Sequence, residues 1–189
     1  MRESKGADVP ERALPVVVVM GVSGTGKSTV GRALATALGV EYAEGDDLHP
    51  AANIAKMSAG IPLTDEDRAP WLDEVAAWLA ERSAQGGVIS CSALKRAYRD
   101  RLRAAAPDAF FLHLAAPRDE LARRMTGRTG HFMPSSLLDS QLAALEPLAG
   151  DEHGSTVDAT RDPVELARET SAALRDRQRR DQLRPAADL

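Results

Sequence analysis

The sequence predicts an α/β protein with three α/β/α layers, a central parallel sheet of about five strands and a small lid. Two observations carry this prediction. Short apolar runs alternate along the chain with longer stretches of helical periodicity, and this alternation is typical of parallel, doubly wound sheets. The first run, residues 15–20 (PVVVVM), is apolar throughout, as in strands that are buried on both faces.

The remaining strands and helices are predicted from short apolar runs, from helical periodicity and from residues that typically begin or end a helix. Gly39 ends the first helix, and residues 64–67 (TDED) resemble a capping box that opens a long helix. Further strands are expected at residues 40–43, 88–91, 109–114 and 156–159. Helices are expected at residues 27–38, 50–58, 64–85, 94–105, 119–126, 136–145 and from 163 into the 170s.

The length of 189 residues fits a single domain with a core of its own. We place this domain at residues 14–175, with the lid at about 124–146. Residues 1–13 are polar and lack periodicity, so they are expected to form a flexible extension. Residues 176–189 are rich in Arg and Asp and are expected to form a frayed tail.

Composition excludes several classes of protein. Aromatic residues make up 4% of the chain and the formal net charge is −4, which argues against a nucleic-acid partner. The one cysteine rules out an internal disulfide and a cysteine-rich metal site. No apolar run approaches the ~18 residues of a membrane helix, and the first residues lack a signal-peptide core. We therefore expect a cytoplasmic protein with no membrane partner.

A phosphate-binding loop follows the first strand. Residues 21–28 (GVSGTGKS) match G-x-x-x-x-G-K-[ST], in which glycines let backbone N–H groups surround phosphates, the lysine reaches the β- and γ-phosphates, and the hydroxyl ligates Mg²⁺. A chance glycine-rich turn is the alternative, but the position between a strand and a helix disfavours it. ATP and Mg²⁺ are thus expected at Gly21, Ser23, Gly24, Thr25, Gly26, Lys27, Ser28 and Thr29.

The loop alone does not distinguish a kinase from a nucleotide-dependent switch or a motor ATPase. The chain lacks an N-K-x-D guanine motif, and its later strands do not end in Asp, so a small-molecule kinase fits best. Asp46 follows the second strand, where an acceptor binds in such sheets, although an aspartate there could also cap a helix. Arg124 and Arg128 suit a lid, whereas Arg123 also fits a helix C-terminus.

Several blocks in order resemble the P-loop gluconokinase family, which is related to shikimate kinase and the nucleoside monophosphate kinases. The resemblance covers about residues 15–175. It implies a kinase fold and ATP-dependent, Mg²⁺-dependent transfer of phosphate to the 6-hydroxyl of D-gluconate, and it implies a homodimer. The matching blocks are residues 45–50 (GDDLHP), 53–57 (NIAKM), 65–72 (DEDRAPWL), 91–103 (CSALKRAYRDRLR), 130–134 (GHFMP), 140–141 (SQ) and 145–147 (LEP).

This substrate class suits the polar residues of the matching blocks. A sugar-acid carboxylate favours basic partners, for which we expect Lys56, Arg68, Lys95 and Arg99. Its hydroxyls need donors and acceptors, for which we expect Asp46, His49, His131, Gln141 and Glu146. Lys27, Asp46, Arg124 and Arg128 are expected to be catalytic, with Ser28 and Asp46 near the metal.

Each of these residues also has an alternative role. His49 could cap the helix that follows it, His131 could be a surface histidine, and Arg68 could pair with a neighbouring aspartate. His113 is expected to be structural and His153 to lie on the surface. Trp71, Trp78 and Cys91 are expected in the core, and residues 158–163 near adenine. A shikimate-kinase-like enzyme and a nucleotide-dependent switch stay open as competing functions.

Overall fold

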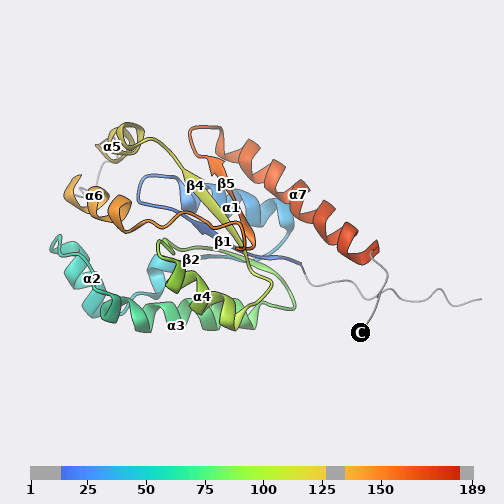
Figure 1. Cartoon of the computed structure of the whole chain (residues 1–189), viewed down its shortest axis with the longest axis horizontal. Coiled ribbons are helices and arrows are strands. Elements are labelled where there is room, and N and C mark those ends of the chain that lie inside the picture. Colours follow the sequence, from blue (N-terminus) through green and yellow to red (C-terminus); the bar gives the residue numbers. More distant parts are fainter. Residues whose placement is uncertain (1–13, 127–134, 184–189) are drawn as a thin grey trace, which may run out of the picture.

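The computed structural model describes residues 14–126 and 135–183 and contains a parallel sheet of five strands (Figure 1). The strand order is β2-β3-β1-β4-β5, and every neighbouring pair is parallel. The three-layer α/β/α architecture is thereby confirmed. The strands are β1 (Val16–Met20), β2 (Tyr42–Glu44), β3 (Gly87–Ser90), β4 (Phe110–Ala115) and β5 (Gly154–Asp158).

Helices cover both faces of the sheet. α1 and α7 pack against one face, and α3 and α4 pack against the other (Figure 1). The helical segments are α1 (Lys27–Leu38), the 3₁₀ turn η1 (Gly45–Leu48), α2 (Ala51–Ser58), α3 (Asp65–Glu81), α4 (Arg96–Ala105), α5 (Arg118–Thr126), α6 (Ser135–Ala144) and α7 (Pro163–Leu183).

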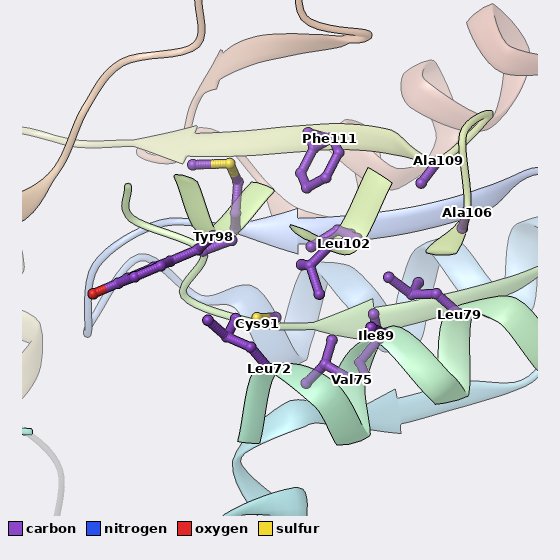
Figure 2. Packing of buried hydrophobic residues seen from close by; sticks show 14 of the residues in the cluster. Leu72, Val75, Leu79, Ile89, Cys91, Tyr98, Leu102, Ala106, Ala109 and Phe111 are labelled. Carbon is purple, nitrogen blue, oxygen red and sulfur yellow. The ribbon is translucent and has the colours of Figure 1, made fainter. Parts of the chain in front are cut away.

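The core is divided by the alternation of side chains along β1. Val16, Val18 and Met20 join the cluster beneath α3 and α4, whereas Val17 and Val19 join the cluster beneath α1 and α7. Successive side chains of a strand point to opposite faces, which explains why this run is apolar at every position. Figure 2 shows the first cluster, in which α3 and α4 side chains meet those of β3 and β4.

A smaller cluster joins the elements around the phosphate-binding loop. Val22 from the loop packs with Leu94, Leu121 and Leu138, which precede α4 and lie in α5 and α6. Burial of such side chains stabilises by roughly 1.5–3 kcal/mol each. This contact places α6, which lies within the expected lid, directly beside the loop.

Element boundaries differ from the expectations mainly near chain ends and turns. The capping box is confirmed, since Thr64 Oγ1 accepts from Asp67 N and Asp67 Oδ2 accepts from Thr64 N. α7 continues to Leu183, so the expectation of a frayed tail from residue 176 was wrong for its first eight residues. No helix in the described ranges is both long and apolar enough to cross a membrane.

The strand register brings the polar segments to one edge of the sheet. β1 pairs with β3 so that Val19 lies beside Ser90, and β2 pairs with β3 so that Glu44 also lies beside Ser90. The chain leaves β1, β2 and β3 at this common carboxyl edge, where ligands bind in open α/β sheets. The phosphate-binding loop, η1 and Ser92 therefore surround the same space.

Candidate active site

The loop after β1 has the backbone geometry of an anion-binding site. Gly21 has φ +141°, and a Cβ there would lie 2.6 Å from the carbonyl oxygen of Leu114. Gly26 has φ +90° and precedes α1, whose N-terminus has neither a side-chain cap nor an acidic residue in its first turn. The N–H groups and positive dipole end of α1 are thus directed at the loop, where phosphate binds.

Side chains inside the loop hold its shape. Thr25 is buried, and its hydroxyl donates to the carbonyl oxygen of Val22 at 2.9 Å. The Lys27 ammonium donates to the same oxygen at 3.2 Å. Ser28 and Thr29 follow in the first turn of α1, with Thr29 exposed. All eight residues expected at the nucleotide therefore lie in the loop after β1 and in the first turn of α1.

One cavity of about 500 Å³ borders this loop, and we call it the Arg124 cavity. It brings the loop together with the end of α5 and with the segment between β5 and α7. Residues 160–163, expected near adenine, belong to this lining, and so does Arg123. The lining residues include Gly24, Thr25, Gly26, Thr29, Arg123, Arg124, Thr160, Arg161, Asp162 and Pro163.

Glu120 orients the two arginines of α5. It accepts from Arg123 Nη2 and from Arg124 Nε, both at 2.7 Å. These hydrogen bonds lower the pKa of the Glu120 carboxyl to about 2. Arg123 is largely exposed, as expected for a residue that pairs along its helix, whereas Arg124 is more enclosed.

A second cavity of about 100 Å³ borders the loop at Ser23 and Lys27, and we call it the Asp46 cavity. η1, α3, α6 and the segment after β3 contribute its polar side chains, while Met57, Ile61, Pro62 and Leu63 contribute an apolar wall. Its other lining residues are Ser23, Lys27, Asp46, His49, Arg68, Trp71, Ser92, Leu94, Leu137, Ser140 and Gln141.

The Asp46 carboxylate is exposed to this cavity. Neither η1 nor α2 has a side-chain cap, so the capping alternative for Asp46 and His49 was wrong. Within residues 14–126 and 135–183 the Asp46 side chain makes no hydrogen bond. A carboxylate in this position is available to accept a proton or to bind a cation.

Arg68 lines the same cavity and has hydrogen-bond donors that the described part of the chain does not use. Its Nη1 donates to the carbonyl oxygen of Leu63 at 2.5 Å, and Asp65 lies 4.0 Å away. Its Nε and Nη2 make no hydrogen bond to the described part of the chain. These two groups form the edge of the guanidinium that binds a carboxylate in a bidentate manner.

His49 and Gln141 complete the polar lining. His49 is buried against Trp71, and this burial lowers its pKa; Arg68 lowers it further, while Asp46 opposes the shift. Gln141 Oε1 accepts from the backbone N–H of Ser23 at 2.7 Å, so α6 contacts the phosphate-binding loop itself. The cavity therefore offers a neutral histidine, an amide, a carboxylate and two cations.

The expectation that Arg99 binds substrate was wrong. Its side chain is fully buried, and its Nε and Nη2 donate to Glu152 at 2.6 and 2.7 Å. Its Nη1 donates to the carbonyl oxygens of Ala93, Leu94 and Glu146. Arg99 thus has a full set of protein partners and holds the wall of the cavity from behind.

Three other expected substrate residues do not line the Asp46 cavity. Lys56 donates to both oxygens of Asp67 at 2.7 and 2.8 Å, and Lys95 donates to Asp65. The Glu146 carboxylate accepts from Arg96 N at 2.5 Å and so caps α4. Arg128 and His131 lie outside the described residues.

The structure also brings residues to the site that sequence reasoning missed. Ser92 lies in the cavity lining two residues after β3, and the sheet-edge rule that selected Asp46 selects this position equally. Ser140 lines the cavity beside Gln141. His153 was expected on the surface, but it is half-buried with its ring edge against Phe110. His113 is buried in β4, as expected.

A magnesium ion fits these residues when it arrives with a nucleotide. No group of three His, Cys, Asp or Glu side chains in the described ranges could hold a metal alone. Mg²⁺ characteristically takes one or two protein oxygens and completes its shell with phosphates and water. The Ser28 hydroxyl and the Asp46 carboxylate, at the same edge of the sheet, are donors of that kind.

Comparisons with known proteins agree with this geometry. A family model described as shikimate kinase matches residues 23–175. The gluconokinase of Gluconobacter oxydans is 56% identical over 72% of this chain and 78% of its own, and the thermosensitive gluconokinase of Escherichia coli is 48% identical over 71% and 73%. A crystal structure of a gluconokinase from Sinorhizobium meliloti superposes with TM-score 0.83 at 49% identity, covering 92% of this chain and 99% of that one.

The parallel sheet, the phosphate-binding loop and the two cavities define a P-loop kinase of a small molecule. The match to the family model extends from residue 23 to residue 175 and so includes Asp46 and Arg68, and the relatives match about 70% of the chain. The chain belongs to the gluconokinase family of P-loop kinases.

Proposed function

We propose that this protein transfers the γ-phosphoryl group of ATP to the 6-hydroxyl of D-gluconate, giving 6-phospho-D-gluconate and ADP. One observation carries the proposal: the phosphate-binding loop forms the boundary between two cavities. Gly24 and Gly26 line the Arg124 cavity, whereas Ser23 and Lys27 line the Asp46 cavity. A nucleotide in the first cavity presents its γ-phosphoryl group to an acceptor in the second.

The polar lining of the Asp46 cavity suits a sugar acid. Arg68 has an unused bidentate edge for the carboxylate, and the apolar wall covers the carbon chain. His49, Gln141, Ser92 and Ser140 supply donors and acceptors for the hydroxyls. The names of the relatives support the same substrate, since those of Gluconobacter oxydans and Escherichia coli are gluconokinases.

The catalytic roles follow from the position of each group. Asp46 orients the 6-hydroxyl and accepts its proton as the oxygen attacks phosphorus in line with the leaving ADP oxygen. Lys27, Arg124 and Arg128 stabilise the negative charge that develops on the phosphoryl oxygens. Ser28 and Asp46 would hold Mg²⁺, which would supply further positive charge at the phosphates.

The acceptor is tested by an ADP-release assay with Mg-ATP and D-gluconate, shikimate, glucose or no acceptor. ADP release with gluconate alone supports the proposal. Release with shikimate would replace the acceptor but keep the kinase reaction. Nucleotide binding without release for any acceptor would instead support the nucleotide-dependent switch.

Asp46 is tested with Asp46→Asn, and its neighbour Asp47 supplies the matched control. Loss of a proton acceptor is expected to lower kcat by about 10²-fold or more. Asp47 is exposed on the same turn but does not line the cavity, so Asp47→Asn is expected to keep kcat. Equal losses in both variants would argue for a structural role of the turn.

Two wider features belong to the same proposal. We propose that the protein acts as a homodimer, which light scattering of the purified chain tests directly. We also propose a cytoplasmic location, which fractionation of cells that express the chain would test.

A further inference from the structure

The ring plane of His49 is fixed by stacking. Its ring lies against that of Trp71 with centroids 4.4 Å apart and an interplanar angle of 11°. Trp71 is itself fixed, since its Nε1 donates to the carbonyl oxygen of Gly45 at 2.7 Å and its ring is buried. The two edges of the imidazole are therefore the parts that can form hydrogen bonds.

Asn53 faces one of these edges, and its own orientation is determined by the chain. Its Nδ2 donates to the backbone carbonyl of Asp67 at 2.7 Å. A carbonyl oxygen only accepts, so the atom facing it must be the amide nitrogen and not the amide oxygen. The same nitrogen lies 3.3 Å from His49 Nδ1, and Asn53 is buried.

This contact determines which ring nitrogen carries the proton. An amide NH₂ group has donors but no acceptor, so His49 Nδ1 must accept and must be unprotonated. A neutral imidazole then carries its single proton on Nε2. Protonation of both nitrogens would place an N–H group against the Asn53 NH₂ group, and burial of His49 likewise lowers its pKa.

We propose that Asn53 is a positioning residue that holds His49 in the Nε2–H tautomer, so that His49 presents a hydrogen-bond donor to an oxygen of the acceptor substrate. The Nε2 atom makes no hydrogen bond to the described part of the chain, and His49 lines the Asp46 cavity. The identity of that oxygen, on a sugar acid, rests on the proposed function. The tautomer itself does not.

The pairing of donor and acceptor has a consequence for recognition. A hydroxyl group that donates to the Asp46 carboxylate keeps lone pairs that can accept from His49 Nε2–H. Asp46 lies in η1 and His49 caps its C-terminal end, where the His49 N–H donates to the Asp46 carbonyl oxygen at 3.3 Å. With the proton on Nδ1 instead, the Asp46 carboxylate and His49 Nε2 would both be acceptors, and a hydroxyl group could donate its single proton to only one of them.

Long-range ¹H–¹⁵N NMR spectra of the ligand-free full chain test the tautomer. The chain has four histidines, and the spectrum of His49→Gln identifies the signals of His49 by their loss. We expect Nδ1 at the frequency of an unprotonated nitrogen and Nε2 at that of a protonated one. A protonated Nδ1 in the wild-type chain would overturn the proposal, and no variant needs to fold for this result.

Asn53→Ala and Asn53→Asp test whether Asn53 is the cause. Alanine removes the donor, so the two tautomers should mix; aspartate accepts from Nδ1–H, so the signals of His49 should invert or report a charged ring. Ile54→Ala is the matched control, because Ile54 is exposed on the same helix. Unchanged His49 signals in a folded Asn53→Ala chain would overturn the role of Asn53.

Kinetics of the same variants test the substrate contact. Asn53→Ala is expected to raise KM for gluconate about five- to tenfold, as for a lost neutral hydrogen bond, and to leave KM for ATP unchanged. An unchanged KM for gluconate would overturn the substrate contact. If the wild-type chain does not phosphorylate gluconate, the proposed function fails while the spectra still decide the tautomer.

Discussion

The start of α3 and the middle of α4 each carry an arginine close to the Asp46 cavity, and the two arginines have opposite surroundings. The Arg99 side chain on α4 has no exposed surface, and its guanidinium N–H groups donate hydrogen bonds to Glu152 and to backbone carbonyl oxygens. Arg68 on α3 keeps its Nε and Nη2 groups without partners in the described ranges. The first arginine builds the wall, and the second is available to a ligand.

This difference shows how a structural arginine can be distinguished from a ligand-binding one. The criterion is how many of its guanidinium N–H groups already have an acceptor within the protein. A buried guanidinium must have acceptors for its five N–H groups, because an unpaired buried charge is costly. An arginine that lines a cavity with unused donors can obtain the missing acceptors from a ligand. Substitutions of Arg99 and of Arg68 therefore test this distinction.

Arg99→Ala should produce the largest effect on stability. It removes both hydrogen bonds of the guanidinium to the buried Glu152 carboxylate and leaves the more distant guanidinium groups of Arg103 and Arg96, 3.5 and 3.8 Å away, so we expect a loss of about 3 kcal/mol of unfolding free energy. Urea unfolding measures this loss. The double variant Arg99→Ala with Glu152→Leu should recover part of the lost unfolding free energy. If Arg99→Ala alone is as stable as the wild type, the structural role assigned to Arg99 is wrong.

Arg68→Ala should act on substrate binding and leave the fold almost unchanged. Loss of a charged hydrogen bond of about 1.5–3 kcal/mol corresponds to a rise of about 10- to 100-fold in KM for gluconate. Steady-state kinetics with gluconate and with ATP as the varied substrate separates the two sites. Arg68→Lys should recover little, because an ammonium cannot bind a carboxylate in a bidentate manner; full recovery would contradict the bidentate geometry.

The Arg99–Glu152 pair should also make stability depend on acid. Hydrogen bonds from Arg99 lower the pKa of the Glu152 carboxyl in the folded chain. The resulting stabilisation is complete above the unfolded pKa of about 4.3 and is lost as the pH falls through the lower folded pKa. Unfolding measured from pH 6 to pH 3 should show a shallower decline in Glu152→Gln, and parallel curves would refute this contribution.

Lys95→Ala should have the smallest effect. Its ammonium pairs with the exposed Asp65 carboxylate and does not line the Asp46 cavity. Exposed ion pairs contribute little because water and salt screen them. We expect an unfolding midpoint within measurement error and a KM for gluconate within about twofold of the wild type. A large rise in KM would return Lys95 to the substrate site.

Sequence patterns were informative where chemistry depends on local spacing. The phosphate-binding loop, the capping box at Thr64 and the placement of Asp46 at the sheet edge all follow from a few consecutive residues. Tertiary partners are a different matter. Arg99 and Glu152 are 53 residues apart, so the sequence around Arg99 does not indicate that its guanidinium pairs with a buried carboxylate.

The same reasoning explains the remaining differences. Lys56 and Lys95 looked available for a ligand because Asp67 and Asp65 lie 11 and 30 residues away. The extension of α7 to Leu183 was missed because its last turns are almost wholly polar, and polar stretches resemble tails when only hydrophobic periodicity is considered. Burial and donor counts, which need the fold, resolve each of these cases.

The anchoring by Arg99 has a consequence for the position of α6. Glu146 follows this helix, and its N–H donates to Leu94 O at 2.8 Å while its carbonyl accepts from Arg99. The chain is therefore fixed to the frame of the molecule just after α6, and Leu138 and Gln141 fix the helix itself to the phosphate-binding loop. Arg99 thus helps to position Ser140 and Gln141 in the Asp46 cavity, although it does not line that cavity itself.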